Sequence, residues 1–350
     1  MRAIGWDHPR CVEPMLAAAE AWRDRTGIAI AWDFRPLADF NDQPLHELAP
    51  DKDVLVIDHP AVPEAVAHDA LAPLDELLAP ELVERLVADA IGPSGSSYRY
   101  DGATWALAVD AACHVSAWRA AALEDPPATW PDVLRLAHEM PGRVALPLLA
   151  ADAMCALLSV TAAMGRPLRM DDAVASEPLA LLAELAPLVH PRSWTSSPPD
   201  LLAAMADEDI AYVPLTFGYR GLASDALRFG PVPGGGGAVL GGAGLAVSAA
   251  TRDPRGAAAF VAWACDARAQ CDIVLAHGGQ PAHRAAWSAD DDFLNATRTT
   301  MEHAHVRPLH PAWPAFHRDG GADLAAALRA GEPPEAIADR LSRKLQAVAA

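Results

Sequence analysis

Apolar positions in the first part of the chain alternate between strand-like and helix-like spacing. Residues 2–6 predict a short strand, and residues 13–25 carry an apolar stripe at helical spacing. Gly27 stands just past that helix, where a left-handed cap residue belongs. Apolar residues then alternate over 28–32, and the continuous run 53–57 is typical of a central parallel strand. This order of strand, helix, strand, loop and strand predicts a doubly wound α/β sheet.

The same mixed pattern continues through the middle of the chain. Residues 74–90 have helical spacing, and the pair Asp101-Gly102 between two aromatic-rich runs predicts a β-hairpin. Thr129 is expected to cap a helix that has Pro131 in its first turn. The remaining expected elements are strands at 144–147 and 209–214, a buried helix at 152–164, and C-terminal helices at 323–328 and 334–348.

The last third carries the most informative run of residues. Between Leu240 and Asp266 a Gly-rich entry, a short apolar run, a polar break and an Ala-rich amphipathic stretch predict turn, strand, loop and helix. The turn Gly278-Gly279-Gln280-Pro281 follows shortly after. This order resembles the closing lobe of an extracellular solute-binding protein, the ligand-capturing component of ABC importers. The helix start at Thr129-Trp130-Pro131 is similar to one in the same family.

The resemblance implies a two-lobed periplasmic-binding-protein-like fold of type II, in which each lobe is an α/β sheet flanked by helices. The N-terminal lobe would hold residues 1–109 and about 245–300, and the C-terminal lobe about 110–244 and 301–350. Hinge crossovers would then lie near residues 109, 244 and 300. A length of 350 residues fits two cores, because single cores stop growing near ~250 to 300 residues. The family would close its lobes on a sugar, polyol or organic acid in the cleft between them.

The amino-acid composition narrows the classes of molecule that this protein is expected to bind. The formal charge is -19 with only 27 Lys and Arg, which argues against binding to nucleic acid or to acidic membrane surfaces. No stretch of ~18 apolar residues is free of charges and prolines, so membrane insertion is not expected. The five cysteines show no CxxC spacing, which favours reduced and mostly buried thiols. The expected partner is a small-molecule ligand, joined by an ABC permease if the protein is exported.

The beginning of the chain bears on its location. Met1 leads straight into the first predicted strand, without the basic patch and the apolar run of roughly 7 to 15 residues that form a secretory signal. The sequence as written therefore predicts a cytoplasmic protein, and a trimmed mature form would be periplasmic or extracellular. No GxGxxG motif in a βαβ context, P-loop or HExxH motif occurs, so no cofactor is expected.

Two short motifs predict the ligand-binding edge of the sheet. Asp7-His8 and Asp58-His59 each follow an apolar strand and each precede a proline. In open α/β sheets ligands bind beyond the carboxyl ends of the strands, and parallel pairing brings both motifs to one edge. There they would hydrogen-bond hydroxyls or carboxylates of the ligand. The competing interpretation is that the aspartates only cap the following helices or turns.

Further candidates supply rings, charge and close backbone approach. Aromatic rings stack on sugar faces, and an arginine pairs bidentately with a carboxylate or phosphate. Gly242 would let the backbone approach a ligand, and Asp110 falls near the supposed hinge. The predicted ligand-binding residues, besides the two Asp-His pairs, are Trp6, Asp110, Phe217, Tyr219, Arg220, Gly242, Gln280 and Trp313.

Two alternatives and one exclusion complete the prediction. A cytoplasmic enzyme of lyase, isomerase or hydrolase type could use His8, Asp58 and His59 for acid–base chemistry on an organic acid or acyl-CoA. A cytosolic sensor could close on a metabolite without chemistry. The histidines near the C-terminus match no recognised metal-ligand spacing, so no metal site is predicted among His303, His305, His310 and His317.

Overall fold

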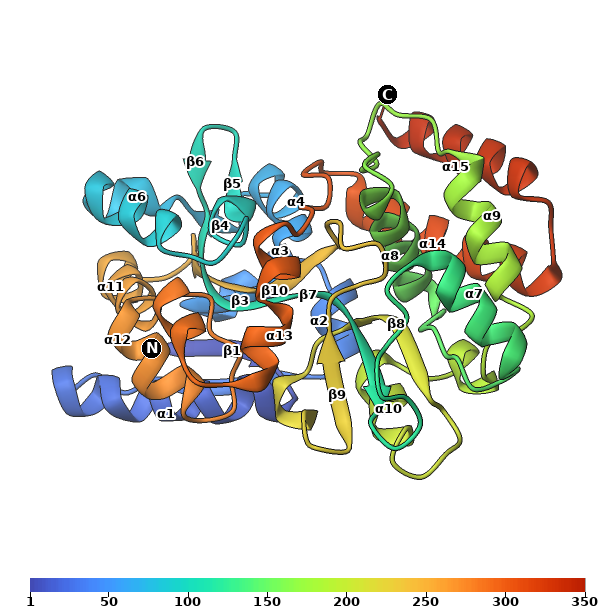
Figure 1. Cartoon of the computed structure of the whole chain (residues 1–350). Helices are drawn as coiled ribbons and strands as arrows, with labels where there is room; N and C mark the ends of the chain where they lie inside the picture. The colour runs from blue at the N-terminus through green and yellow to red at the C-terminus, as the bar shows by residue number, and fades with distance from the viewer. Residues whose placement is uncertain (350) are drawn as a thin grey trace. The chain divides into compact units, whose positions relative to one another are not determined.

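The computed structural model describes residues 1–349 and divides them into two compact units. Unit 1 contains residues 1–112, 241–291 and 309–311, and unit 2 contains the rest. The chain passes between the units after Ala112, Leu240, Asp291, Pro308 and Pro311. The mixed α/β class predicted from the sequence is confirmed (Figure 1).

The sheet of unit 1 has parallel strands at one side and antiparallel strands at the other. β1 pairs in parallel with β2 and β3, while β10 runs antiparallel to β3 and β4. The strand order is β2-β1-β3-β10-β7, and β7 continues from unit 1 into unit 2. The strands are β1 (Arg2–Trp6), β2 (Ala31–Arg35), β3 (Val54–Ile57), β4 (Leu71–Ala72), β7 (Ala106–Arg119) and β10 (Leu240–Ser248), with a separate hairpin of β5 (Arg99–Tyr100) and β6 (Ala103–Thr104).

Helices pack apolar side chains on this sheet. Trp22 from α1 meets Phe260 from α11 edge to face at 5.6 Å between ring centroids, so the two helices share one layer of the core (Figure 1). The helices of unit 1 are α1 (Pro9–Thr26), α2 (Leu37–Asp42), α3 (Leu45–Leu48), α4 (Val62–Ala67), α5 (Leu74–Leu77), α6 (Pro80–Ala88), α11 (Pro254–Ala264) and α12 (Ala267–Ala269), with short 3-10 turns that include η2 (His59–Ala61).

Local chemistry explains where these elements begin and end. Gly27 ends α1 in the left-handed conformation at φ 76°, as the sequence predicted. The hairpin is also confirmed, with Asp101 and Gly102 both at positive φ as a type I′ turn requires. The single helix predicted over 74–90 is wrong, because Pro80 cannot donate a backbone hydrogen bond and instead starts a new helix, α6.

Two expected strands of the sequence analysis need correction. β2 begins at Ala31 rather than at residue 28, because its partner in the register is Arg2 at the start of β1. Residues 144–147 form no strand; the contact with the sheet of unit 2 is the isolated bridge from Val144 to Tyr212.

Unit 2 pairs the second half of β7 with two antiparallel strands and surrounds them with helices. Thr129 caps α7 through its side chain, as predicted, and accepts a hydrogen bond from the backbone N–H of Asp132. The elements are β8 (Tyr212–Phe217), β9 (Leu227–Gly230), α7 (Trp130–Glu139), α8 (Ala150–Ala163), α9 (Ser176–Leu185), α10 (Pro198–Ala204), α13 (Asp292–Glu302), α14 (Trp313–Ala330) and α15 (Pro334–Ala349).

The core of unit 2 depends on a close contact between two of its helices. A Cβ added at Gly321 of α14 would lie 2.0 Å from the carbonyl oxygen of Ala150 in α8, so only glycine fits there. Met154 of α8 and Phe316 of α14 belong to the same buried cluster. The helix predicted at 323–328 is thus part of the longer helix α14, which begins at Trp313 and ends at Ala330.

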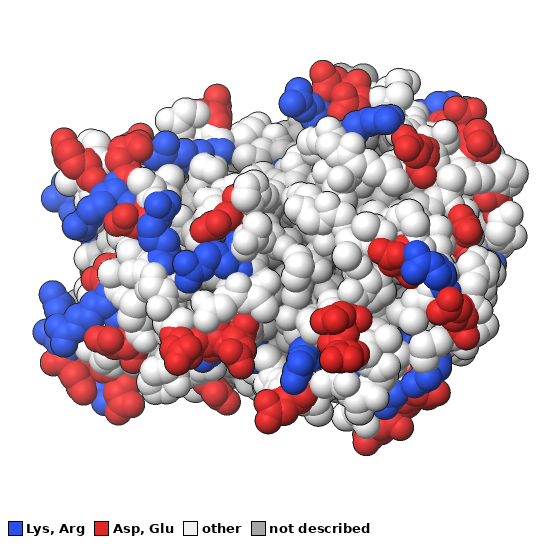
Figure 2. Space-filling view, in the orientation of Figure 1, with Lys and Arg blue, Asp and Glu red and all other residues white. Residues whose placement is uncertain are grey.

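The surface charges and the cysteines are arranged as the composition led us to expect. Figure 2 shows acidic and basic side chains interspersed on the face in view. Among residues 1–349 none of the five cysteines forms a disulfide, and four of them are buried. A search of the described helices found none with the length and apolar character that a membrane crossing requires.

Candidate functional site

The carboxyl ends of two parallel strands in unit 1 carry the two Asp-His motifs. Ile4 of β1 lies beside Leu55 of β3, so residues 7–8 and residues 58–59 leave the sheet at the same edge. This placement is the one that the sequence predicted. Asp7 is exposed at this edge, and His8 is half-buried.

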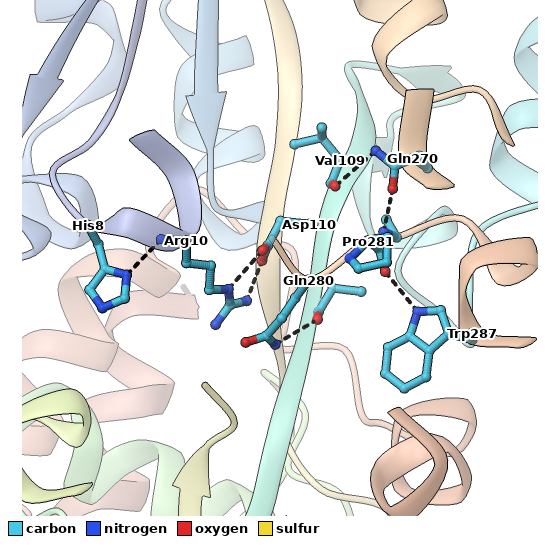
Figure 3. Close-up of polar contacts among 10 residues, drawn as sticks. His8, Arg10, Val109, Asp110, Gln270, Gln280, Pro281 and Trp287 are labelled. Atoms are coloured by element: carbon cyan, nitrogen blue, oxygen red, sulfur yellow. Dashed lines mark hydrogen bonds and ion pairs between the residues drawn. The ribbon is translucent and has the colours of Figure 1, made fainter. Parts of the chain in front are cut away.

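His8 acts as a helix cap. Its Nδ1 accepts a hydrogen bond from the backbone N–H of Arg10 at 3.1 Å, at the start of α1 (Figure 3). Burial lowers the pKa of His8, and the nearby Arg10 guanidinium lowers it further. The neutral imidazole is therefore favoured, and Asp7 is not the residue that caps the helix.

The second motif also caps the turn that follows it. Asp58 Oδ1 accepts a hydrogen bond from the backbone N–H of His59 at 2.9 Å, at the start of η2. His59 is fully buried and meets the ring of Tyr98 edge-on at 6.3 Å between centroids. The capping interpretation holds for Asp58, whose Oδ1 also lies 3.2 Å from Nδ1 of His59.

A buried ion pair joins α1 to β7 in unit 1. Arg10 donates from Nε to Asp110 Oδ2 at 2.8 Å and from Nη2 to Asp110 Oδ1 (Figure 3). The two residues are only 8% and 5% exposed. The bidentate geometry fixes both side chains, because the planar guanidinium matches the two carboxylate oxygens.

The turn predicted from its Gly-Gly-Gln-Pro sequence lies against the same stretch of β7. The backbone N–H of Ala111 donates to the carbonyl of Gln280 at 2.9 Å, and the Gln280 side chain donates back to the carbonyl of Ala111 at 3.2 Å (Figure 3). Asp110 and Pro281 form an isolated antiparallel bridge. The turn therefore holds the backbone on both sides of the Asp110 carboxylate.

A second glutamine, which the sequence analysis did not select, anchors the turn from behind. Gln270 donates from Nε2 to the carbonyl of Val109 at 3.1 Å, and its Oε1 accepts from the backbone N–H of Ala282 at 2.6 Å (Figure 3). Trp287 donates from Nε1 to the carbonyl of Pro281 at 2.7 Å. These bonds make the turn a rigid support for the ion pair.

Gly242 has a positional role of its own at this edge. Its φ is 97°, and an added Cβ would lie 2.4 Å from the carbonyl oxygen of Asp110. The close approach observed at Gly242 is between the backbones of β10 and β7, whereas the approach of Gly242 to a ligand stays a prediction. The observed approach brings the Gly242 backbone next to the residue that bears the buried carboxylate.

A small cavity borders the ion pair, with room for about one water molecule. Its lining is mostly apolar, and the Arg10–Asp110 pair supplies the charge. The lining residues are Trp6, Arg10, Cys11, Pro14, Met15, Val56, Val109, Asp110 and Val274. Burial raises the pKa of the Cys11 thiol to about 12, so this thiol stays protonated at neutral pH.

The other predicted residues belong to unit 2. Phe217 ends β8 and packs its ring against His114 at 4.5 Å between centroids, while Tyr219 is buried and Arg220 is partly buried. Trp313 is fully buried at the start of α14, in the core cluster. Within unit 1 the structure brings Asp7, His8, Asp58 and His59 to one edge of the sheet, and it places Trp6, Gly242 and Gln280 around Asp110. The ligand-contact role of every predicted residue stays a prediction.

Arg10 is the main residue that the sequence analysis missed. It stands directly after the first Asp-His-Pro motif, and the first turn of α1 directs its side chain toward β7. An arginine in the first turn of a helix is unfavourable for the helix dipole, and this placement is a signal that sequence reasoning could have used.

Sequence comparison identifies one family and no individual relative. Residues 17–294 match the family described as bacterial extracellular solute-binding protein. No curated protein matches the chain significantly.

Solved structures share the fold over nearly the whole chain. An ABC transporter solute-binding protein from Thermotoga lettingae, bound with alpha-D-tagatose, has a TM-score of 0.84 at 17% identity and covers 100% of this chain and 99% of its own. One from Agrobacterium radiobacter in complex with ribitol has a TM-score of 0.79 at 17% identity, covering 99% and 98%. Maltose-bound MalE3 of T. maritima has a TM-score of 0.82 at 16% identity, covering 99% of each chain. These comparisons support ligand capture and lend no support to the enzyme alternative.

Proposed function

Because this chain belongs to the bacterial extracellular solute-binding proteins, we propose that it captures a sugar or polyol as the first step of ABC import. The similar structures from Thermotoga lettingae and Agrobacterium radiobacter hold tagatose and ribitol. The feature of this chain that carries the proposal is the buried Arg10–Asp110 pair at the carboxyl edge of the parallel strands.

The ion pair has the chemistry that a polyhydroxy ligand needs. Each Asp110 oxygen accepts one hydrogen bond from Arg10 and keeps a lone pair that accepts a ligand hydroxyl. Bonds to ionised groups are roughly twice as strong as neutral ones. The exposed Asp7 supplies a second carboxylate at the same edge, and the Gln270 and Gln280 bonds keep the backbone around Asp110 in place.

The other predicted binding residues and the predicted hinges belong to the same proposal. Phe217, Tyr219 and Arg220 would contribute rings and charge from unit 2, whereas Trp313 is fully buried in the core cluster and would contribute no ligand contact in this conformation. Hinges near 109, 244 and 300 would permit closure. The protein works outside the cytoplasmic membrane, as its family does, and delivers its ligand to an ABC permease. A permease gene adjacent to the gene for this chain is the expected genomic observation, and adjacent catabolic genes alone would argue against import.

A thermal-shift panel tests ligand capture directly. Purified protein is heated with tagatose, ribitol, mannitol, maltose, organic acids and acyl-CoA esters, and the ligand is recovered afterwards. A sugar or polyol at ~100 times its Kd should add about 2.7 kcal/mol of stability and raise Tm. The compound should be recovered unchanged. A shift produced only by an acid or a thioester, or chemical conversion of the compound, would contradict the proposal.

Variants of the ion pair then locate the ligand. Asp110→Asn keeps the shape of the side chain but removes its charge, and it should weaken binding roughly tenfold or more, equivalent to about 1.4 kcal/mol. The control is Arg23→Gln, at the exposed end of α1, which should leave the Kd unchanged. If Asp110→Asn and the control bound the ligand with equal affinity, the ligand would not contact this ion pair.

A further inference from the structure

A separate group of metal-ligating side chains lies on α3 and α4 of unit 1. His46 belongs to α3, Glu64 belongs to α4, and His68 directly follows α4. The two helices are neighbours in the fold (Figure 1). One potential ligand atom from each of the three side chains lies within 4.8 Å of the others. Among the residues that the structure describes, no other group of His, Cys, Asp or Glu meets the same criterion.

The two imidazoles are already arranged with respect to each other. Their rings stack at 4.2 Å between centroids with an interplanar angle of 14°. Glu64 and His68 are four residues apart, so they project from the same side of one helical turn. The three side chains are therefore already close enough to reach one ion, and metal binding would turn the two rings so that their nitrogens converge on it.

Hydrogen bonding selects the nitrogen that each histidine would offer. His68 Nδ1 lies 2.8 Å from the carbonyl oxygen of Glu64 and donates to it, which leaves the lone pair on Nε2. Metal-binding histidines usually donate their other ring N–H in this way, because the bond fixes the tautomer and the ring orientation.

His46 supplies a second, independent observation. Its Nδ1 is buried and has no hydrogen-bond partner among the described residues. A buried polar atom without a partner costs free energy, so native proteins rarely leave one unsatisfied. A coordinated metal ion would satisfy this nitrogen.

From these contacts we propose that His46, Glu64 and His68 bind a divalent transition-metal ion, with zinc as the best fit. Two imidazole nitrogens and one carboxylate oxygen form a common ligand set for Zn²⁺, and a water completes the tetrahedron. Mg²⁺ and Ca²⁺ are disfavoured because they prefer oxygen ligands. The net charge of -19 attracts the cation.

The metal would link two short helices of unit 1. α3 has four residues and α4 has six, and isolated helices of this length are unstable. α4 directly continues η2, the turn that contains His59. Zinc binding would therefore restrain the segment that leads from the second Asp-His motif.

Isothermal titration of the full chain, first stripped with a chelator, tests this site with Zn²⁺ alone. One Zn²⁺ should bind per chain and raise Tm, and EDTA should reverse the shift. His46→Ala and His68→Ala should each weaken binding at least roughly tenfold. Glu64→Gln should also weaken it, and far-UV circular dichroism should show that the variants are folded.

His277 provides a matched control. It is exposed, and its Nδ1 bonds to the carbonyl of Ile273 at 2.9 Å, the same local arrangement as in His68. His277→Ala should bind zinc like the wild type. Zinc-edge X-ray absorption on the wild type should show two imidazoles with Zn–N near about 2.0–2.1 Å. The assignment would be overturned by no zinc binding, by wild-type zinc affinity in both His46→Ala and His68→Ala, or by an equal loss of affinity in His277→Ala.

Discussion

At the scale of single residues, the buried Arg10–Asp110 pair decides much of what unit 1 can do. Removal of water from both charges is costly, and only their bidentate contact compensates for it. Replacement of only one of the two side chains should therefore destabilise the fold strongly, because the other charge stays buried without its partner. The surface pair Arg192–Glu208 has similar chemistry but lies in water, where such pairs contribute little.

A double-mutant cycle measures this difference. Arg10→Met should lower the free energy of unfolding by about 3–5 kcal/mol, because Asp110 remains buried without its partner. Arg192→Met should cost at most about 1 kcal/mol. The double variant Arg10→Met/Asp110→Leu should recover much of the loss, since both buried charges are then absent. Additive losses in urea denaturation would show that the two side chains are not coupled.

At the scale of elements, the sequence predicted turns and helix caps better than it predicted the register of the strands. Gly27, Asp101-Gly102 and Thr129 each determine a turn or cap through their own backbone or side chain, and all three predictions are confirmed. The start of β2 could not be predicted, because it depends on pairing with the first residues of β1.

The candidate site shows the same limit. Parallel pairing made the common edge of Asp7 and Asp58 predictable. The partnership of Arg10 with Asp110 joins residues one hundred positions apart, and no local pattern contains that information. The group of His46, Glu64 and His68 was missed for the same reason, since His46 comes from a different helix.

Gly242 tests how closely β10 must approach β7. Gly242→Ala should destabilise the protein by about 2–5 kcal/mol, because it adds strain at positive φ and a clash with the Asp110 carbonyl. Gly27→Ala is the matched control: its φ is 76°, but an added Cβ meets nothing within 4 Å. The control should cost only about 1–2 kcal/mol. Similar losses in chemical denaturation for both variants would exclude the close approach as the cause.

At the scale of the whole molecule, buried histidines link stability to pH. Burial lowers the pKa of His114 from 6.5 to about 3, and burial also lowers the pKa of His8, His283 and His305. The unfolded chain therefore binds more protons than the folded one below about pH 6.5. The stability that these groups contribute is complete above that pH and is lost on acidification.

One carboxyl group opposes this trend. Burial raises the pKa of Asp152 from 3.8 to about 7, so the folded state keeps a proton that the unfolded chain releases. Its contribution to stability falls as the pH rises from about 4 to 7. The net pH dependence is the sum of both effects, and variants can separate them.

Measurement of unfolding between pH 7.5 and 4.5 tests this balance. Well below pH 6.5, each buried histidine with a lowered pKa, such as His114, should change the free energy of unfolding by up to about 1.4 kcal/mol per pH unit. His114→Gln should flatten the acid-side loss of stability, whatever its effect on stability at pH 7.5. Asp152→Asn should steepen the loss, because the opposing group is gone. His138→Gln, at an exposed histidine on α7, should leave the curve unchanged. If the slope of His114→Gln equalled that of the wild type, burial of His114 could not be the source of the acid sensitivity.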